Sequence, residues 1–120
     1  MPRDARAYLA DILESCDAIA LAVRELDLDG YRSSRLVRSS VEREFTIIGE
    51  AVAALARKAP AVFAAITQAR RIVDFRNQLT HEYPGVSDTL VWGIADRDVP
   101  ILRRECAALM DSLESGGKTG

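Results

Sequence analysis

Apolar residues recur along the first half of this chain at the three- and four-residue steps of an α-helix. The first stripe predicts a helix over residues 4–26, capped by Asp4, with the members Tyr8, Ile12, Cys16, Ile19, Val23 and Leu26. Residues 27–34 break the pattern and contain Gly30 and serines, so they predict a connection or a short helical turn. A second long helix then ends before Pro60, and its stripe consists of Val37, Val41, Phe45, Ile48, Val52 and Leu55.

The segment after Pro60 predicts two further helices. Residues 60–66 can form a brief helix with proline in its first turn. Thr67 is placed to cap the next helix, which runs to about His81. Pro84 disfavours helical angles at the residue before it, so this helix is expected to stop there.

The remainder predicts a short helix over 88–94 and a kink or restart just before Pro100. A final helix follows, with an apolar stripe of Leu102, Cys106, Leu109 and Leu113. No strand pattern, repeat or linker interrupts the chain. Four main helices with short connections predict an all-α, up-and-down four-helix bundle with short extra helices. We expect one domain over 1–114 and a flexible tail over 115–120.

Charge and cysteine content narrow the classes of function. The chain as a whole is not basic, since its formal charge is −2. Nucleic-acid binding would therefore need a local basic patch. Arg70 and Arg71 are candidates for that patch. Cys16 and Cys106 lie far apart on apolar faces, which predicts buried, reduced thiols rather than metal ligands. The chain has no signal-type or membrane-spanning apolar run, and we expect it to be cytoplasmic.

The stretch "RNQLTHEY" holds the chain's one histidine, His81, five positions after Arg76. On a regular helix these two side chains lie roughly 140° apart and do not meet. They could be surface residues that complement a helix C-terminus. They could also meet if the helix loosens before Pro84, or if a two-fold dimer brings each arginine near the partner's histidine. A lone histidine without a carboxylate cluster is a poor metal site, so no metal is expected.

Three blocks of sequence resemble one known family. "FRNQLTHEY" matches the R-x4-H-x-Y signature of HepT-like proteins in the HEPN superfamily of small helical ribonucleases. "VEREFTIIGEAV" resembles the central helix of that family, and "GVSDTLVWGIADRDVPILRREC" resembles its C-terminal half. The blocks occur in order and cover nearly the whole chain.

This resemblance implies a homodimeric, metal-independent endoribonuclease with no cofactor, in which Arg76 and His81 are catalytic and RNA is the substrate. It also implies a toxin of a type VII toxin–antitoxin system. The partner would be an MntA-like nucleotidyltransferase antitoxin that silences the toxin by adenylylating Tyr83. Asn77 could orient the arginine, and Glu50 could hold it when RNA is absent.

The residue types suit that chemistry. RNA supplies its own nucleophile, the 2′-hydroxyl, so the protein needs a group that transfers protons and a cation for the phosphate. Histidine, with an unperturbed pKa of about 6.5, can serve in either protonation state near neutral pH. Arginine offers a planar, charged fork for phosphate oxygens. The alternative is a non-catalytic HEPN-like module that binds a nucleotidyltransferase or its substrate, because a fold alone does not establish activity.

Overall fold

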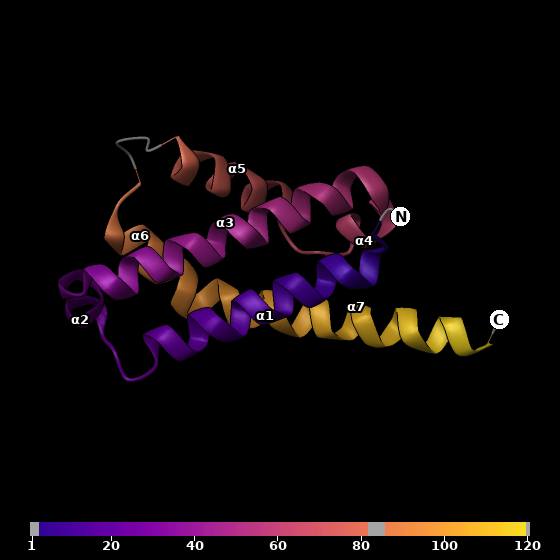
Figure 1. Ribbon diagram of the computed structural model, residues 1–120, viewed down its shortest axis with the longest axis horizontal. Helices are drawn as coiled ribbons and strands as arrows, with labels where there is room; N and C mark the ends of the chain where they lie inside the picture. The colour runs from indigo at the N-terminus through magenta and orange to yellow at the C-terminus, as the bar shows by residue number, and fades with distance from the viewer. Residues whose placement is uncertain (1–2, 82–85, 120) are drawn as a thin grey trace.

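The computed structural model describes residues 3–81 and 86–119, and every regular element in these ranges is a helix (Figure 1). The long helices of the described part are α1 (Ala5–Val23), α3 (Arg35–Lys58), α5 (Ala69–Thr80) and α7 (Val99–Thr119). The short ones are α2 (Leu28–Ser33), α4 (Pro60–Ala64), α6 (Asp88–Gly93) and the π-helix η1 (Ile94–Asp98). The predicted all-α fold, with four main helices and short extra ones, is confirmed.

The long helices pack as a series of neighbours around an apolar interior. α1 packs against α3 and against α7, and α3 packs in turn against α5. Figure 1 shows α5 along the side of α3 that is remote from α7. The interior includes Leu9, Ile12, Ile19, Val41, Ile48, Val52, Leu55 and Cys106. Burial of one large aliphatic side chain contributes about 1.5–3 kcal/mol, so this interior is the main source of stability.

Polar side chains begin the first two long helices. Asp4 caps α1 by accepting hydrogen bonds from the backbone N–H groups of Arg6 and Ala7, at 2.9 and 3.3 Å. The hydroxyl of Ser34 accepts from the backbone N–H of Val37 at the start of α3, at 3.2 Å. These contacts satisfy donors that a helix leaves unpaired in its first turn. The predicted cap at Asp4 is confirmed.

The predicted cap of α5 at Thr67 is wrong. α5 begins at Ala69, and Gln68 before it has a left-handed backbone with a φ of 55°. Thr67 bonds instead to the carboxylate of Glu105 on α7, through its backbone N–H at 3.0 Å and through its hydroxyl. This contact joins residues 38 positions apart, so a local sequence pattern could not reveal it.

The irregularity predicted before Pro100 is confirmed as the π-helix η1, which leads directly into α7. Proline has no N–H to donate, and its ring clashes with the carbonyl four residues earlier, so a regular α-helix cannot continue through it. A wider turn accommodates this position. α7 extends to Thr119, beyond the predicted domain end at 114. The predicted domain boundary and the flexibility of 115–120 stay predictions.

The two cysteines are both buried free thiols, as their apolar stripes predict. Burial raises the pKa of each thiol, Cys16 and Cys106, to about 12. Thiolate is the reactive form of cysteine, so neither thiol is activated near neutral pH. Among the described residues, no helix combines the length and apolar character needed to cross a membrane.

Candidate active site

α5 carries the arginine and histidine of the motif and is attached to the bundle mainly through α3. Two of its residues are buried, Ala69 and Phe75. The Phe75 ring meets the ring of Phe45 on α3 edge-on, with centroids 5.2 Å apart. Such edge-to-face pairs are a favoured aromatic geometry. This contact sets the rotation of α5 on α3 and so the direction of the next residue, Arg76.

Arg76 lies directly on Gly49 of α3. Gly49 is buried, and a Cβ atom added to it would lie 2.2 Å from the Cβ of Arg76 and 2.5 Å from its Cγ. The aliphatic stem of the arginine therefore occupies the space that a side chain at Gly49 would need. The Nε atom of Arg76 is buried and has no hydrogen-bond partner. Gly49 was not among the predicted site residues, although a glycine among the inward positions of a long helix is a signal of close approach.

His81 is the residue that ends α5. Its side chain is exposed, and its backbone N–H still donates to the carbonyl of Asn77 at 3.1 Å. The helix is thus regular from Arg76 to its end, and the side chains of Arg76 and His81 diverge by roughly 140°. One chain therefore does not bring the two together by loosening of the helix. Asn77 is exposed beside Arg76, and Tyr83 lies outside the described residues.

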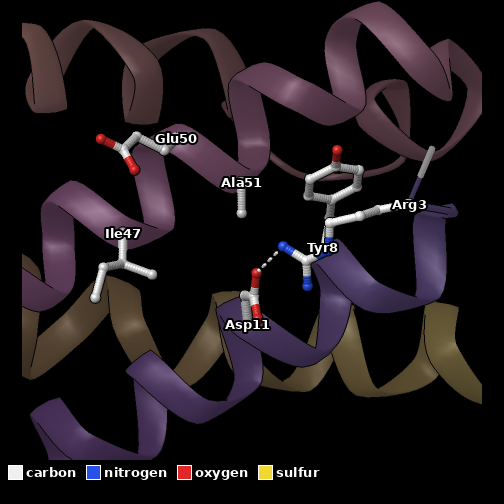
Figure 2. Close-up of a pocket in the computed structure, with 6 residues that line it drawn as sticks. All are labelled: Arg3, Tyr8, Asp11, Ile47, Glu50 and Ala51. Carbon is white, nitrogen blue, oxygen red and sulfur yellow. Dashed lines mark hydrogen bonds and ion pairs between the residues drawn. The ribbon is translucent and has the colours of Figure 1, made fainter. Parts of the chain in front are cut away.

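Glu50 lies on a different side of α3. It lines a hollow of about 160 Å³ between α3 and the start of α1, together with Arg3, Tyr8, Asp11, Ile47 and Ala51. Figure 2 shows its carboxylate pointing away from the ion pair of Arg3 and Asp11. In the described part of the chain, no ion pair or hydrogen bond joins Glu50 to Arg76. Its proposed role as a holder of the arginine stays a prediction.

The cations around this hollow have partners on the protein. Arg3 pairs with Asp11 at 2.8 Å, and its guanidinium carbon lies 4.9 Å from the ring centroid of Tyr8. Lys58 donates to the Tyr8 hydroxyl at 3.0 Å. These contacts around the hollow therefore help to join α1 to α3. Across residues 3–81 and 86–119, no three side chains of His, Cys, Asp or Glu gather in a way that could hold a metal.

The neighbouring Arg70 and Arg71 point to different surroundings. Arg71 donates to the side-chain oxygen of Gln68 at 2.7 Å and lines a groove of about 1000 Å³ that α5 forms with η1 and α7. The guanidinium carbon of Arg70 lies 5.5 Å from the ring centroid of Phe63. The described lining of the groove does not include Arg76. The two arginines therefore have different surroundings, and their role in binding RNA stays a prediction.

A second charged cluster lies where α2, α3 and α6 meet. Arg38 approaches the carboxylate of Asp88 at 3.9 Å. Tyr31 is fully buried, and its hydroxyl has no hydrogen-bond partner. Burial raises the pKa of Glu42, and the charge of Asp88 adds to the rise. Arg38 precedes Gly49 by about 16 Å along a regular helix, so this cluster is separate from the motif.

Replacing Glu42 with glutamine is expected to raise the thermal midpoint at pH 7. The pKa of Glu42 is raised in the fold above its ordinary 4.5. A raised carboxyl pKa contributes stability that is present below the ordinary value and is lost as the pH rises through the folded value. The neutral amide avoids that loss, so the gain should disappear below pH 4.5. Thermal unfolding at a series of pH values tests this, with Glu14→Gln, an exposed position on α1, as the control. Equal midpoints of wild type and Glu42→Gln at pH 7 would contradict the prediction.

Known proteins resemble this chain along most of its length. A protein of Methanocaldococcus jannaschii named "Putative RNase MJ1380" is 32% identical over 103 residues, which cover 86% of this chain and 94% of that protein. "Probable ribonuclease HepT" of Thermococcus cleftensis is 28% identical over 103 residues, which cover 86% of this chain and 93% of that protein. No solved structure matches this chain.

The family described as Ribonuclease HepT-like matches residues 12–109. That range contains the helix α5, the site of close approach at Gly49, and the whole "RNQLTHEY" stretch. The match therefore covers the part of the fold in which Arg76 and His81 are placed. The chain belongs to the Ribonuclease HepT-like family.

Proposed function

We propose that this chain is a metal-independent endoribonuclease with Arg76 and His81 as its catalytic residues. The observation that carries the proposal is the geometry of α5. It holds the stem of an arginine against Gly49 and ends one turn later at an exposed histidine. These are a phosphate-binding cation and a proton-transfer group on one helix. The names of the relatives in Methanocaldococcus jannaschii and Thermococcus cleftensis support RNA as the substrate.

The reaction uses a nucleophile that the substrate supplies. The 2′-oxygen of one nucleotide loses its proton and attacks the adjacent phosphorus, and the bond from phosphorus to the 5′-oxygen breaks. The products are a 2′,3′-cyclic phosphate and a 5′-hydroxyl. His81 either accepts the proton from the 2′-hydroxyl or donates one to the leaving 5′-oxygen, and water makes the other proton transfer. Arg76 binds the phosphate oxygens as negative charge develops on them, and Asn77 beside it supports that contact.

The proposed site is composite and lies between two copies of the chain. Within one copy the regular helix keeps Arg76 and His81 on different faces. A two-fold axis beside α5 would place the arginine of each copy near the histidine of the other. In such a symmetric interface each contact occurs twice, once from each copy. Arg70 and Arg71 would then contribute positive charge from both copies to one RNA-binding surface.

The same chain is proposed as the toxin of a type VII toxin–antitoxin system of the HepT/MntA-like kind. Its partner would be an MntA-like nucleotidyltransferase that attaches an adenylyl group to Tyr83. The family membership and the H-x-Y sequence at His81 and Tyr83 support this step. The modification would place a phosphate and a nucleotide two residues from the proposed proton-transfer group.

Incubation of the purified protein with single-stranded RNA tests the proposed reaction. We expect cleavage to continue in excess EDTA and to leave 2′,3′-cyclic phosphate, or the 3′-phosphate formed from it by hydrolysis. A matched substrate with 2′-deoxyribose at the cleavage position should stay intact, because it lacks the attacking oxygen. Activity that EDTA abolishes and Mg²⁺ restores would show that the proposed mechanism is wrong.

A further inference from the structure

α3 and α5 approach each other closely where the proposed catalytic arginine leaves its helix. Gly49 is buried, and the Cβ and Cγ of Arg76 occupy the space beside it, as the distances of 2.2 and 2.5 Å from an added Cβ show. These atoms belong to the fixed base of the arginine side chain and not to its flexible end. A residue larger than glycine therefore cannot be accommodated by a new rotamer of Arg76.

An aromatic contact next to Arg76 also holds α5 against α3. The edge-to-face contact of Phe45 with Phe75 is adjacent to Arg76 along α5 and one turn before Gly49 along α3. Packed interiors transmit such a strain because they have few voids. An added methyl group would have to push α5 outward or rotate it on α3. Either movement carries Arg76 with it.

The buried Nε atom indicates that this contact serves more than stability. Nε is a hydrogen-bond donor, and it is buried here without a partner. A buried donor without a partner is unfavourable. An aliphatic side chain at position 76 would fill the same space beside Gly49 without that penalty. The arrangement therefore places a guanidinium where a simple packing residue would be the more stable choice.

We propose that Gly49 is a positioning residue that sets where the guanidinium of Arg76 meets RNA phosphate. The inference rests on the proposed function only in taking Arg76 as the residue that contacts the phosphate. By holding the first two side-chain carbons against α3, Gly49 removes freedom from the arginine before substrate binds. A pre-positioned cation stabilises developing charge without reorganisation.

Gly49→Ala is expected to slow RNA cleavage by about 10²-fold, the effect of a displacement of roughly 1 Å in a catalytic group. The matched control is Gly93→Ala on α6. A Cβ there would meet only the guanidinium of Arg97, with Nη2 at 3.1 Å and Cζ at 3.9 Å, which is the far end of a flexible side chain. The control should cleave RNA at the wild-type rate. Circular dichroism and size exclusion establish that each variant keeps its fold and assembly.

A second background separates positioning from general damage. Arg76→Gly removes both atoms that an alanine at position 49 would strike. We expect Gly49→Ala to cause no further loss in that background. The residual rate and the rescue of that rate by added methylguanidinium should stay the same, and the thermal midpoint should not fall, because alanine is the better helix former. If Gly49→Ala alone fails to fold, the double variant should fold. Wild-type activity of Gly49→Ala, or an equal loss in both backgrounds, would overturn the inference.

Failure of the proposed function gives a different result. In that case wild type cuts no RNA, or Arg76→Ala cuts it at the wild-type rate. The thermal midpoint alone then tests the contact between Gly49 and Arg76. A midpoint that Gly49→Ala lowers with Arg76 present and does not lower in Arg76→Gly supports the contact, and an equal change in both backgrounds overturns it.

Discussion

His81→Ala is expected to slow RNA cleavage by about 10²- to 10⁴-fold, the range typical for loss of a general acid or base. The side chain is exposed at the end of α5, so its removal takes little from the packed interior. The fold and the thermal midpoint should therefore stay close to those of the wild type. Initial rates on an end-labelled RNA, with circular dichroism of the same preparations, measure both effects.

Arg76→Ala should reduce the same rate by about 10²- to 10³-fold, as is typical when a donor to a developing oxyanion is removed. Arg104→Ala is the control, because Arg104 is an exposed arginine on α7, away from the motif helix. It tests whether the loss of one positive charge is enough to weaken activity. A wild-type rate in either motif variant would rule out the assigned role of that residue.

Mixing the two inactive variants tests the composite site. Each proposed site takes its arginine from one copy and its histidine from the other. A mixed dimer then has one site with both residues and one site with neither. Random pairing makes half of the dimers mixed, so co-expression should restore about a quarter of the wild-type rate. A site contained within one chain would gain nothing from mixing. A protein that is monomeric at micromolar concentration would also exclude the composite arrangement.

Co-expression with an MntA-like nucleotidyltransferase is expected to silence the wild type and to leave Tyr83→Phe toxic. An adenylyl group on Tyr83 would add a phosphate near His81 and within the same motif as Arg76. That phosphate could pair with the arginine in place of RNA, by the charge effect that underlies regulatory phosphorylation. We expect the partner to neutralise the wild type completely and to leave the toxicity of Tyr83→Phe unchanged. Growth after induction and peptide mass spectrometry measure it.

Tyr8→Phe is the matched control for this test. Tyr8 belongs to α1, and its hydroxyl accepts a hydrogen bond from Lys58. The Tyr8→Phe protein should remain sensitive to the partner enzyme and should carry the adenylyl group on Tyr83. Modification confined to another residue, or neutralisation of Tyr83→Phe by an active partner, would contradict the proposed switch.

The helical fold followed from local patterns because each long helix has its own apolar stripe. Ile12, Cys16 and Ile19 are all buried along α1, as the spacing of the first stripe predicts. Capping by Asp4 and the irregular turn before Pro100 were also readable, because both depend on residues within a few positions. Arg76 and His81 were found through the sequence motif, and not through any predicted contact.

The contacts between helices were not readable in the same way. The bond between Thr67 and Glu105 depends on how α7 approaches the turn before α5, which no single helix pattern contains. The contact of Gly49 with Arg76 depends on the register between α3 and α5. The raised pKa of Glu42 results mainly from its burial in the fold, with the charge of Asp88 on α6 adding to it. Each of these features arises from the packing of elements that are distant in sequence.

The attachment of α5 mainly to α3 has a consequence for local opening of the protein. α5 buries two residues, whereas α3 buries eight. Segments with few buried apolar contacts can open without global unfolding, and their amide hydrogens then exchange with solvent sooner. Among the described side chains of the long helices, α5 therefore has the fewest buried residues. A second copy of the chain, or bound RNA, would slow amide exchange in α5 more than in the interior helices, because the interior helices are already closed.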